Sequence, residues 1–216
     1  MISFKEVSSK FDSGAGIENA TFKIDAGEFL CVIGPTGAGK TTLLKLIYMD
    51  IFPDKGTVKV DKFSSDKIKR RNIPMLRRKI GMVFQKFELL NDRTVFDNVA
   101  IPLHVQGIGI KAVKDEVEHV LDNLGIADRR NHLPSELSGG EQQIVSLARA
   151  LVKTPLIILA DEPTGNLDPS ASLRVIELLE EINDNGTAIL MATHNYSMVK
   201  DRGHRFLQIV EGVVRG

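Results

Sequence analysis

The sequence has few of the residues that build disulfides or long apolar segments. Its 216 residues include one cysteine, no tryptophan and two tyrosines. Cys31 has no second cysteine with which to form an internal disulfide, and its position in an apolar run indicates a buried thiol in a reducing cytosol. Apolar runs such as 156–160 are far shorter than the ~18 residues that span a bilayer, and the residues after Met1 lack the apolar core of a signal peptide. We therefore expect a cytoplasmic chain that neither crosses a membrane nor is exported.

A net charge is also absent, because 28 Lys and Arg balance 28 Asp and Glu. A neutral chain has no overall field to attract nucleic acid, so we expect no nucleic-acid partner. The charge is unevenly distributed, since the segment 62–79 holds eight basic residues and one acidic residue, a net charge of +7. This pattern favours a solvated helix face, with contact to an anionic membrane surface or an acidic partner as the alternative.

The apolar pattern predicts an α/β fold. At roughly 150 residues per domain, the length suits one large domain with room for an inserted subdomain. Short alternating or clustered apolar segments near the amino terminus predict strands, and continuous apolar runs further on predict strands buried on both faces of a parallel sheet. The expected strands are 4–7, 20–24, 29–33, 80–84, 156–160 and 188–193.

Helices are expected between these strands. A stripe of apolar residues over 43–47 and an amphipathic pattern over 111–124 each predict a helix. Ser138 and Glu141 form a capping-box pattern at the start of another, and Asp168 can cap a further helix that ends near Gly186. We therefore predict an α/β nucleotide-type core from 1–86 and 153–216, interrupted by a helical subdomain over 87–152.

A phosphate loop lies between the expected strand 29–33 and the helix that follows it. The sequence there matches G-x-x-x-x-G-K-[ST], with glycines that allow successive N–H groups to point at an anion and a helix whose positive dipole end adds to the attraction. Lys40 would reach the β- and γ-phosphates, and the Thr41 hydroxyl would bind Mg²⁺. The expected nucleotide-binding residues are Gly34, Pro35, Thr36, Gly37, Ala38, Gly39, Lys40, Thr41 and Thr42.

Two acids follow the expected strand 156–160. Asp161 and Glu162 would lie at the carboxyl end of a parallel strand, where open α/β sheets place their ligands. Asp161 is the expected magnesium partner, and Glu162 is the carboxylate placed to accept a proton from an attacking water. An acid pair in this position is common by chance, but together with the phosphate loop it indicates a nucleotide-hydrolysing site.

The segment 137–143, Leu-Ser-Gly-Gly-Glu-Gln-Gln, is a small-residue turn that opens a helix. It resembles the signature sequence of ABC-type ATPases, and with the phosphate loop and the Asp161–Glu162 pair the resemblance covers essentially the whole chain. The resemblance implies a P-loop core with a small antiparallel β subdomain. It also implies a homodimer with two ATP molecules at its interface, in which Ser138, Gly139 and Gly140 of one copy bind the γ-phosphate held by the other.

The same resemblance implies roles for four further residues. Gln85 would sense Mg²⁺ and the attacking water, and His194 would contact the γ-phosphate and help to orient Glu162. Asp168 would lie at the contact between subunits, although it could equally be only a helix cap. Phe11 is the candidate for the aromatic ring that stacks on adenine, although an aromatic near the amino terminus can also belong to the core.

A biological role follows from what such an ATPase lacks. No phosphoacceptor site is apparent, so water is the expected acceptor of the γ-phosphoryl group. Because the chain has no expected membrane span, the protein that it drives must be a separate integral membrane chain, which would dock near 87–103. The amino-acid sequence of 89–103 resembles that of the cell-division members of the family. The alternative is an ATPase of a lipoprotein-releasing or macrolide-export system, which would share every catalytic residue. A soluble ABC protein that acts on DNA or ribosomes is a further alternative, but it needs a second cassette or a long insertion.

The phosphate-loop assignment predicts the effect of removing its lysine. Lys40→Ala should weaken ATP binding, because the ammonium that contacts the β- and γ-phosphates is lost. Isothermal titration calorimetry measures this directly. An unchanged ATP affinity in Lys40→Ala would contradict the assignment.

Overall fold

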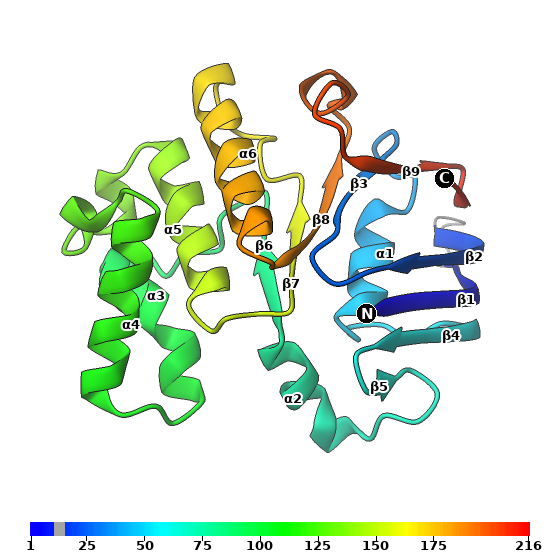
Figure 1. Ribbon diagram of the computed structural model, residues 1–216, viewed down its shortest axis with the longest axis horizontal. Coiled ribbons are helices and arrows are strands. Elements are labelled where there is room, and N and C mark those ends of the chain that lie inside the picture. The colour runs from blue at the N-terminus through cyan, green and yellow to red at the C-terminus, as the bar shows by residue number, and fades with distance from the viewer. Residues whose placement is uncertain (11–15) are drawn as a thin grey trace.

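The computed structural model describes residues 1–10 and 16–216. In this part of the chain ten strands form one sheet in the order β5-β4-β1-β2-β10-β9-β3-β8-β7-β6, with helices on both of its faces (Figure 1). The strands are β1 (Ile2–Lys10), β2 (Gly16–Ile24), β3 (Phe29–Ile33), β4 (Lys55–Val60), β5 (Phe63–Ser64), β6 (Ile80–Val83), β7 (Ile157–Asp161), β8 (Ala188–Thr193), β9 (Arg205–Val210) and β10 (Val213–Arg215).

The helices fall into three groups. The α-helices are α1 (Lys40–Ile47), α2 (Ile73–Arg78), α3 (Val95–Val105), α4 (Ile110–Asn123), α5 (Gly139–Leu151) and α6 (Pro169–Asp184). α1 follows the phosphate loop, α3, α4 and α5 form the lobe at the left of Figure 1, and α6 lies against the parallel strands together with the short α2, which precedes β6. Short 3₁₀ turns are η1 (Arg70–Asn72), η2 (Ala127–Arg129), η3 (Pro134–Glu136) and η4 (Tyr196–Met198).

The parallel strands are β9, β3, β8, β7 and β6. Of these, β3, β8 and β7 are buried on both faces, whereas β9 buries Leu207 and Ile209 on one face and leaves most of the other face exposed. In β3, Phe29 and Cys31 pack into a core shared with α3 to α6, whereas Leu30 and Val32 pack into a second core with α1 and the antiparallel strands. Because consecutive side chains of a strand point to opposite faces, continuous apolar runs are what such strands require. The expected strands at 29–33 and 188–193 are confirmed, and the expected 156–160 is shifted by one residue.

An antiparallel sheet of β1, β2, β4 and β5 continues the parallel strands at the right of Figure 1. Its inner face packs on α1 through residues such as Phe4 and Phe22, whose rings stack at 4.5 Å. The predicted α/β fold is therefore confirmed. The boundaries 1–86, 87–152 and 153–216 remain a prediction.

One expectation about secondary structure is wrong. The basic segment 62–79 is not a single helix face, because it runs through β5, an irregular stretch, η1 and the six-residue α2. Ile73 and Pro74 start α2 only after the irregular stretch, and Pro74 suits the first turn of a helix because its missing N–H has no partner there in any case. No helix among residues 1–10 and 16–216 is both long and apolar enough to cross a bilayer.

Candidate functional site

A hollow of about 380 Å³ lies where β3, β6, β7 and β8 end. The chain leaves the carboxyl ends of these parallel strands through loops, and side chains from all four loops meet there. The hollow is lined by Thr36, Gly37, Gly39, Lys40, Thr41, Thr42, Gln85, Asp161, Glu162 and His194. Ten residues predicted from the sequence to act together therefore lie together.

The phosphate loop has a conformation that requires glycine. Gly39 has a φ of 111°, and a Cβ placed on it would lie 2.4 Å from the carbonyl oxygen of Gly16. A Cβ on Gly34 would likewise lie 2.3 Å from the carbonyl oxygen of Ile209. The loop is therefore packed against two strands, and its backbone leads directly into α1 at Lys40.

The Lys40 side chain is buried and turned back across the loop. Its Nζ donates to the carbonyl oxygens of Gly34 at 2.8 Å and Pro35 at 3.1 Å, and lies 3.1 Å from Oε1 of Glu162. A buried ammonium needs this set of partners because desolvation is otherwise costly. Lys40 thus joins the phosphate loop to the end of β7.

Glu162 is held from the other side by His194. Its Oε2 lies 2.8 Å from Nδ1 of His194 and accepts a hydrogen bond from the backbone N–H of His194 at 3.2 Å. Glu162 has a φ of 49°, an uncommon left-handed conformation for a residue with a side chain. This conformation places the carboxylate between Lys40 and His194.

Asp161 and Thr41 form a set of oxygen donors beside this carboxylate. The Thr41 hydroxyl donates to Oδ2 of Asp161 at 2.8 Å, and Oδ1 of Asp161 is buried without a partner among the described residues. Burial raises the pKa of Asp161 above its ordinary value. Hydroxyl, carboxylate and amide oxygens are the ligands that Mg²⁺ prefers, and the Gln85 side chain lines the same hollow. The donor set therefore fits Mg²⁺.

The loop after β6 is tied to the loop after β7. The Asn166 side chain donates to the carbonyl oxygen of Gln85 at 2.9 Å. A Cβ on Gly165 would lie 2.6 Å from Nε2 of Gln85, so the glutamine side chain packs directly on that glycine. A displacement of the loop after β6 would therefore also move the loop after β7.

Two residues of α5 extend this connection: Arg149, which the sequence did not point to, and Gln143, the last residue of the segment 137–143. Arg149 donates to the carbonyl oxygens of Glu88 at 2.6 Å and Phe87 at 2.8 Å, and both of those residues have a positive φ. Gln143, fully buried, donates to the carbonyl oxygen of Pro163 at 2.8 Å. The sequence gives no signal for these contacts, because each joins a side chain to backbone far along the chain.

The signature residues lie beside the hollow rather than among its lining residues. Ser138 caps α5 as predicted, since its hydroxyl accepts from the N–H of Glu141 at 3.3 Å. A Cβ on Gly140 would lie 2.9 Å from Cβ of Ala171, so the start of α5 is packed closely against the start of α6. Asp168 caps α6, with its Oδ1 accepting from the N–H groups of Ser170 and Ala171.

Four further predicted nucleotide-binding residues are not among the described residues that line the hollow. Gly34, Pro35 and Ala38 form the body of the phosphate loop, and Ala38 is buried. Phe11, the candidate for adenine stacking, lies outside the described residues. No observation assigns a ligand to any of the predicted site residues, so their roles remain proposals.

The fold and the hollow define a class of protein. A phosphate loop, an acid pair and a histidine at the carboxyl edge of one parallel sheet, with a capped signature helix in a separate helical lobe, define an ATP-binding cassette. A sequence model of the family described as ABC transporter matches residues 17–165. The chain belongs to this family.

Within the family, the chain is an ABC-type ATPase of the cell-division kind. It is 45% identical to the cell division ATP-binding protein FtsE of Mycobacterium tuberculosis, over 98% of this chain and 93% of that protein. The FtsE protein of Escherichia coli is 43% identical, over 100% of this chain and 98% of that protein. A solved dimeric structure of MJ0796, a bacterial ABC transporter cassette, has a TM-score of 0.88 and 32% identity, covering 100% of this chain and 97% of that one.

The capping box of the signature helix predicts a pH dependence. Glu141 accepts hydrogen bonds from Arg129 and Ser138, which lower its pKa from 4.5 to about 2. Since the folded pKa lies below the unfolded one, this stabilisation is complete above pH 4.5 and is lost as the pH falls towards 2. The Glu141 side chain is 29% exposed, so solvent screens part of the interaction.

We therefore expect Glu141→Gln to lower the free energy of unfolding by about 1 kcal/mol at neutral pH and by progressively less in acid. Denaturant unfolding at a series of pH values measures this difference. Glu116→Gln, on the exposed face of α4, serves as the matched control and should show no such dependence. A difference for Glu141→Gln that stays constant into acid would contradict the role of this carboxylate.

Proposed function

We propose that two copies of this chain clasp two ATP molecules between them and use ATP hydrolysis to drive a separate integral membrane protein in cell division. The proposed hydrolysis of ATP is supported by the contacts of Glu162 with Lys40 and His194 at one edge of the sheet. The proposed membrane partner resembles FtsX, and the proposed outcome is regulation of cell-wall hydrolysis. The chain would then act at the inner face of the membrane through its partner.

The contacts of Lys40 indicate the order of events at the site. Its ammonium is shared between two loop carbonyls and Glu162. A triphosphate that enters the loop competes with Glu162 for this ammonium, because both are anions. When Lys40 turns to the phosphates, the Glu162 carboxylate keeps only its contacts with His194 and becomes free to accept a proton from water.

Thr41, Asp161 and Gln85 would hold Mg²⁺ beside the phosphates. When bound there, Mg²⁺ neutralises charge on the phosphate oxygens. The Thr41 hydroxyl is already directed at Asp161, so the two side chains are placed to act on one ligand. Gln85 reaches the same hollow from the end of β6, and its carbonyl oxygen accepts a hydrogen bond from Asn166 in the loop after β7.

A second copy of the chain would complete the site. Ser138, Gly139 and Gly140 lie at the start of α5, where backbone N–H groups and the helix dipole favour an anion. They are not among the residues that line the hollow of their own chain. MJ0796 has a dimeric structure of a post-hydrolysis state bound to ADP and Pi, with a TM-score of 0.88 to this chain. These observations support an arrangement in which the signature of each copy covers the nucleotide of the other.

The segment 87–103 is suited to receive the membrane partner. Asn98, fully buried, donates to the carbonyl oxygens of Leu90, Arg93 and Thr94 and accepts from the N–H of Leu90. The loop 90–94 therefore has a fixed shape, although the Leu90 side chain is 47% exposed. Arg149 ties residues 87 and 88, at the beginning of the segment, to α5, the helix that the signature opens. Gln85 lies two residues before the segment, so a displacement of the segment would act on both.

The cell-division assignment is supported by relatives at 42% to 45% identity that share the name FtsE. An ATPase subunit of a lipoprotein-releasing or macrolide-export system would use the same catalytic residues. The partner that binds 87–103 distinguishes the two, so the identity of that partner is the decisive measurement.

Glu162→Gln tests the proposed general base. The amide cannot take a proton from water, so hydrolysis should slow roughly 100-fold or more, while ATP binding and a trapped dimer are retained. Steady-state phosphate release and nucleotide titration measure the two effects separately. Glu116→Gln should hydrolyse ATP at the wild-type rate. Wild-type turnover in Glu162→Gln would remove Glu162 from the mechanism.

Leu90→Arg tests the proposed docking segment. A tagged wild-type chain should co-purify with a polytopic membrane protein from the native host, and the variant should recover at least tenfold less, because a charge placed in a buried interface costs about 2 kcal/mol or more. Ile110, 86% exposed and outside 87–103, provides the matched control Ile110→Arg. Both variants should keep the ATPase activity of the isolated chain. Equal recovery with Leu90→Arg would exclude this segment as the docking site.

A further inference from the structure

The basic segment 62–79 is anchored to the core by two of its eight basic residues. Arg77 donates to the carbonyl oxygen of Met49 at 3.2 Å and to Asp50 at 3.3 Å, and its guanidinium lies over the Tyr48 ring at 4.4 Å. Lys79 forms an ion pair with Asp61 at 2.9 Å. Leu76, fully buried, adds an apolar anchor. The segment is therefore held in a fixed position.

The other six basic residues are exposed and make no ion pair with any acidic residue in the described part of the chain. They spread over the turn between β4 and β5, the irregular stretch after β5, η1 and α2. The segment's own acid, Asp66, accepts a hydrogen bond from the Ser64 hydroxyl. The six residues are Lys62, Lys67, Lys69, Arg70, Arg71 and Arg78.

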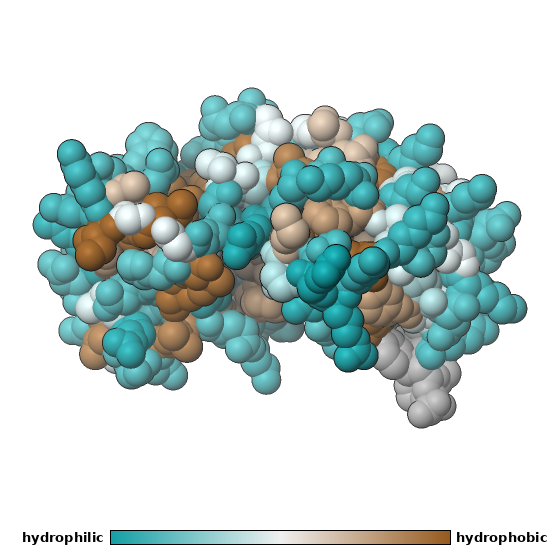
Figure 2. Space-filling view, turned by 90° about the horizontal axis from the view of Figure 1, so that it is seen from below, coloured by the Kyte–Doolittle hydropathy of each residue, from teal (hydrophilic) through white to brown (hydrophobic). Residues whose placement is uncertain are grey.

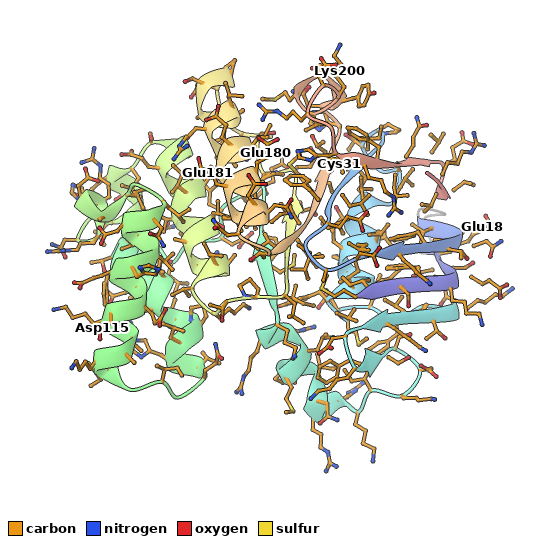
Figure 3. The ribbon with its side chains drawn as sticks, in the orientation of Figure 1. Glu18, Cys31, Asp115, Glu180, Glu181 and Lys200 are labelled. Atoms are coloured by element: carbon orange, nitrogen blue, oxygen red, sulfur yellow. The ribbon has the colours of Figure 1, made fainter. Side chains whose placement is uncertain are left out.

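These cations occupy a projecting part of the molecule. η1 and α2 lie at the lower end of the view in Figure 1, and Figure 3 shows long side chains with nitrogen tips pointing away from the body there. Figure 2, seen from that end, shows strongly hydrophilic side chains in the middle of the face with apolar side chains on either side. A flat surface that approached this end would meet the cations first.

An apolar side chain is exposed close to the cations in the sequence. Met75, in α2, lies between Arg71 and Arg78 and is 51% exposed. Exposed cations with a flanking apolar side chain suit an interface in which anionic headgroups lie above a hydrocarbon layer. An acidic protein segment would satisfy the cations but would not require Met75.

A hollow of about 520 Å³ adjoins the segment. Lys62 and Lys67 line it together with Lys5 and Lys59 from the antiparallel sheet, and the hydroxyl residues Ser3, Thr57 and Ser64 lie on its wall. Asp61 and Asp66 also line it, but Asp61 is paired with Lys79 and Asp66 with Ser64. The ammonium groups and the hydroxyls of Ser3 and Thr57 around one recess suit a phosphate-bearing headgroup.

We propose that the basic segment 62–79 binds an anionic lipid surface, with its exposed cations on the headgroups and Met75 at the level of the hydrocarbon boundary. The surface lies on elements other than those that form the nucleotide hollow, so lipid contact and nucleotide binding occupy different parts of the chain. Direct lipid contact would orient the chain at the membrane, and it would add to the binding that a membrane protein partner provides. This inference does not depend on the identity of that partner.

The test is sedimentation of the purified full chain with vesicles. Wild-type protein should sediment with vesicles of equal parts phosphatidylcholine and phosphatidylglycerol, and not with phosphatidylcholine alone. Binding should disappear at about 1 M salt, where the screening length falls to about 3 Å. The triple variant Lys69→Gln/Arg70→Gln/Arg71→Gln should bind about 100-fold more weakly, and Met75→Ser should bind several-fold more weakly.

A charge-matched control separates this surface from the overall charge. Lys111→Gln/Lys114→Gln/Lys200→Gln also removes three cations, two on α4 and one, Lys200, at the opposite end of the view in Figure 3, and should bind vesicles like the wild type. ATPase activity should be unchanged in both triple variants, which shows that they are folded and separates this test from that of the catalytic proposal.

Two outcomes would overturn the proposal. The first is wild-type protein that fails to bind anionic vesicles, or a basic-segment variant that binds them as well as the wild type. The second is binding of a polyglutamate peptide, lost in the basic-segment variant and insensitive to Met75→Ser, without any binding to vesicles. That second result would assign the surface to an acidic protein segment.

Discussion

The ion pair between Lys40 and Glu162 is the interaction on which the organisation of the candidate site depends. It joins the start of α1 to the end of β7, and His194 at the end of β8 holds the same carboxylate. A charge pair this well buried is stable only when each partner has further hydrogen bonds, and the loop carbonyls and the His194 backbone provide them. The proposed catalytic carboxylate is thereby kept beside the lysine that the phosphates are expected to engage.

The surrounding scaffold makes this geometry rigid. The parallel strands have apolar cores on both faces, so the loops at their carboxyl ends start from fixed points. Asn166, Gln143 and Arg149 then link the loops after β6 and β7 to the signature helix by hydrogen bonds from side chains to backbone. These links are the physical route by which a nucleotide in the hollow and a partner on 87–103 would influence one another.

The nucleotide site and the proposed partner and lipid sites lie on different parts of the chain. The nucleotide hollow lies at loops that follow the carboxyl ends of strands, and the signature lies at the start of α5. The segment 87–103 carries an exposed leucine on a loop shaped by Asn98, and the basic segment projects from the end marked by η1 and α2. Binding of nucleotide, membrane protein and lipid would therefore not compete for the same residues.

Elements with local signals could be predicted from the amino-acid sequence. Glycine spacing identified the phosphate loop, the Ser138–Glu141 pair identified the start of α5, and continuous apolar runs identified the buried strands. The sequence did not reveal that the basic segment runs through several short elements, because its charges do not encode a helix boundary. Nor did it reveal Arg149 or Asn98, whose partners are backbone atoms. The strand order β3-β8-β7-β6, which brings His194 next to Glu162, could be seen only in the folded chain. Pairing between distant strands depends on the packing of whole sheet faces rather than on local preference.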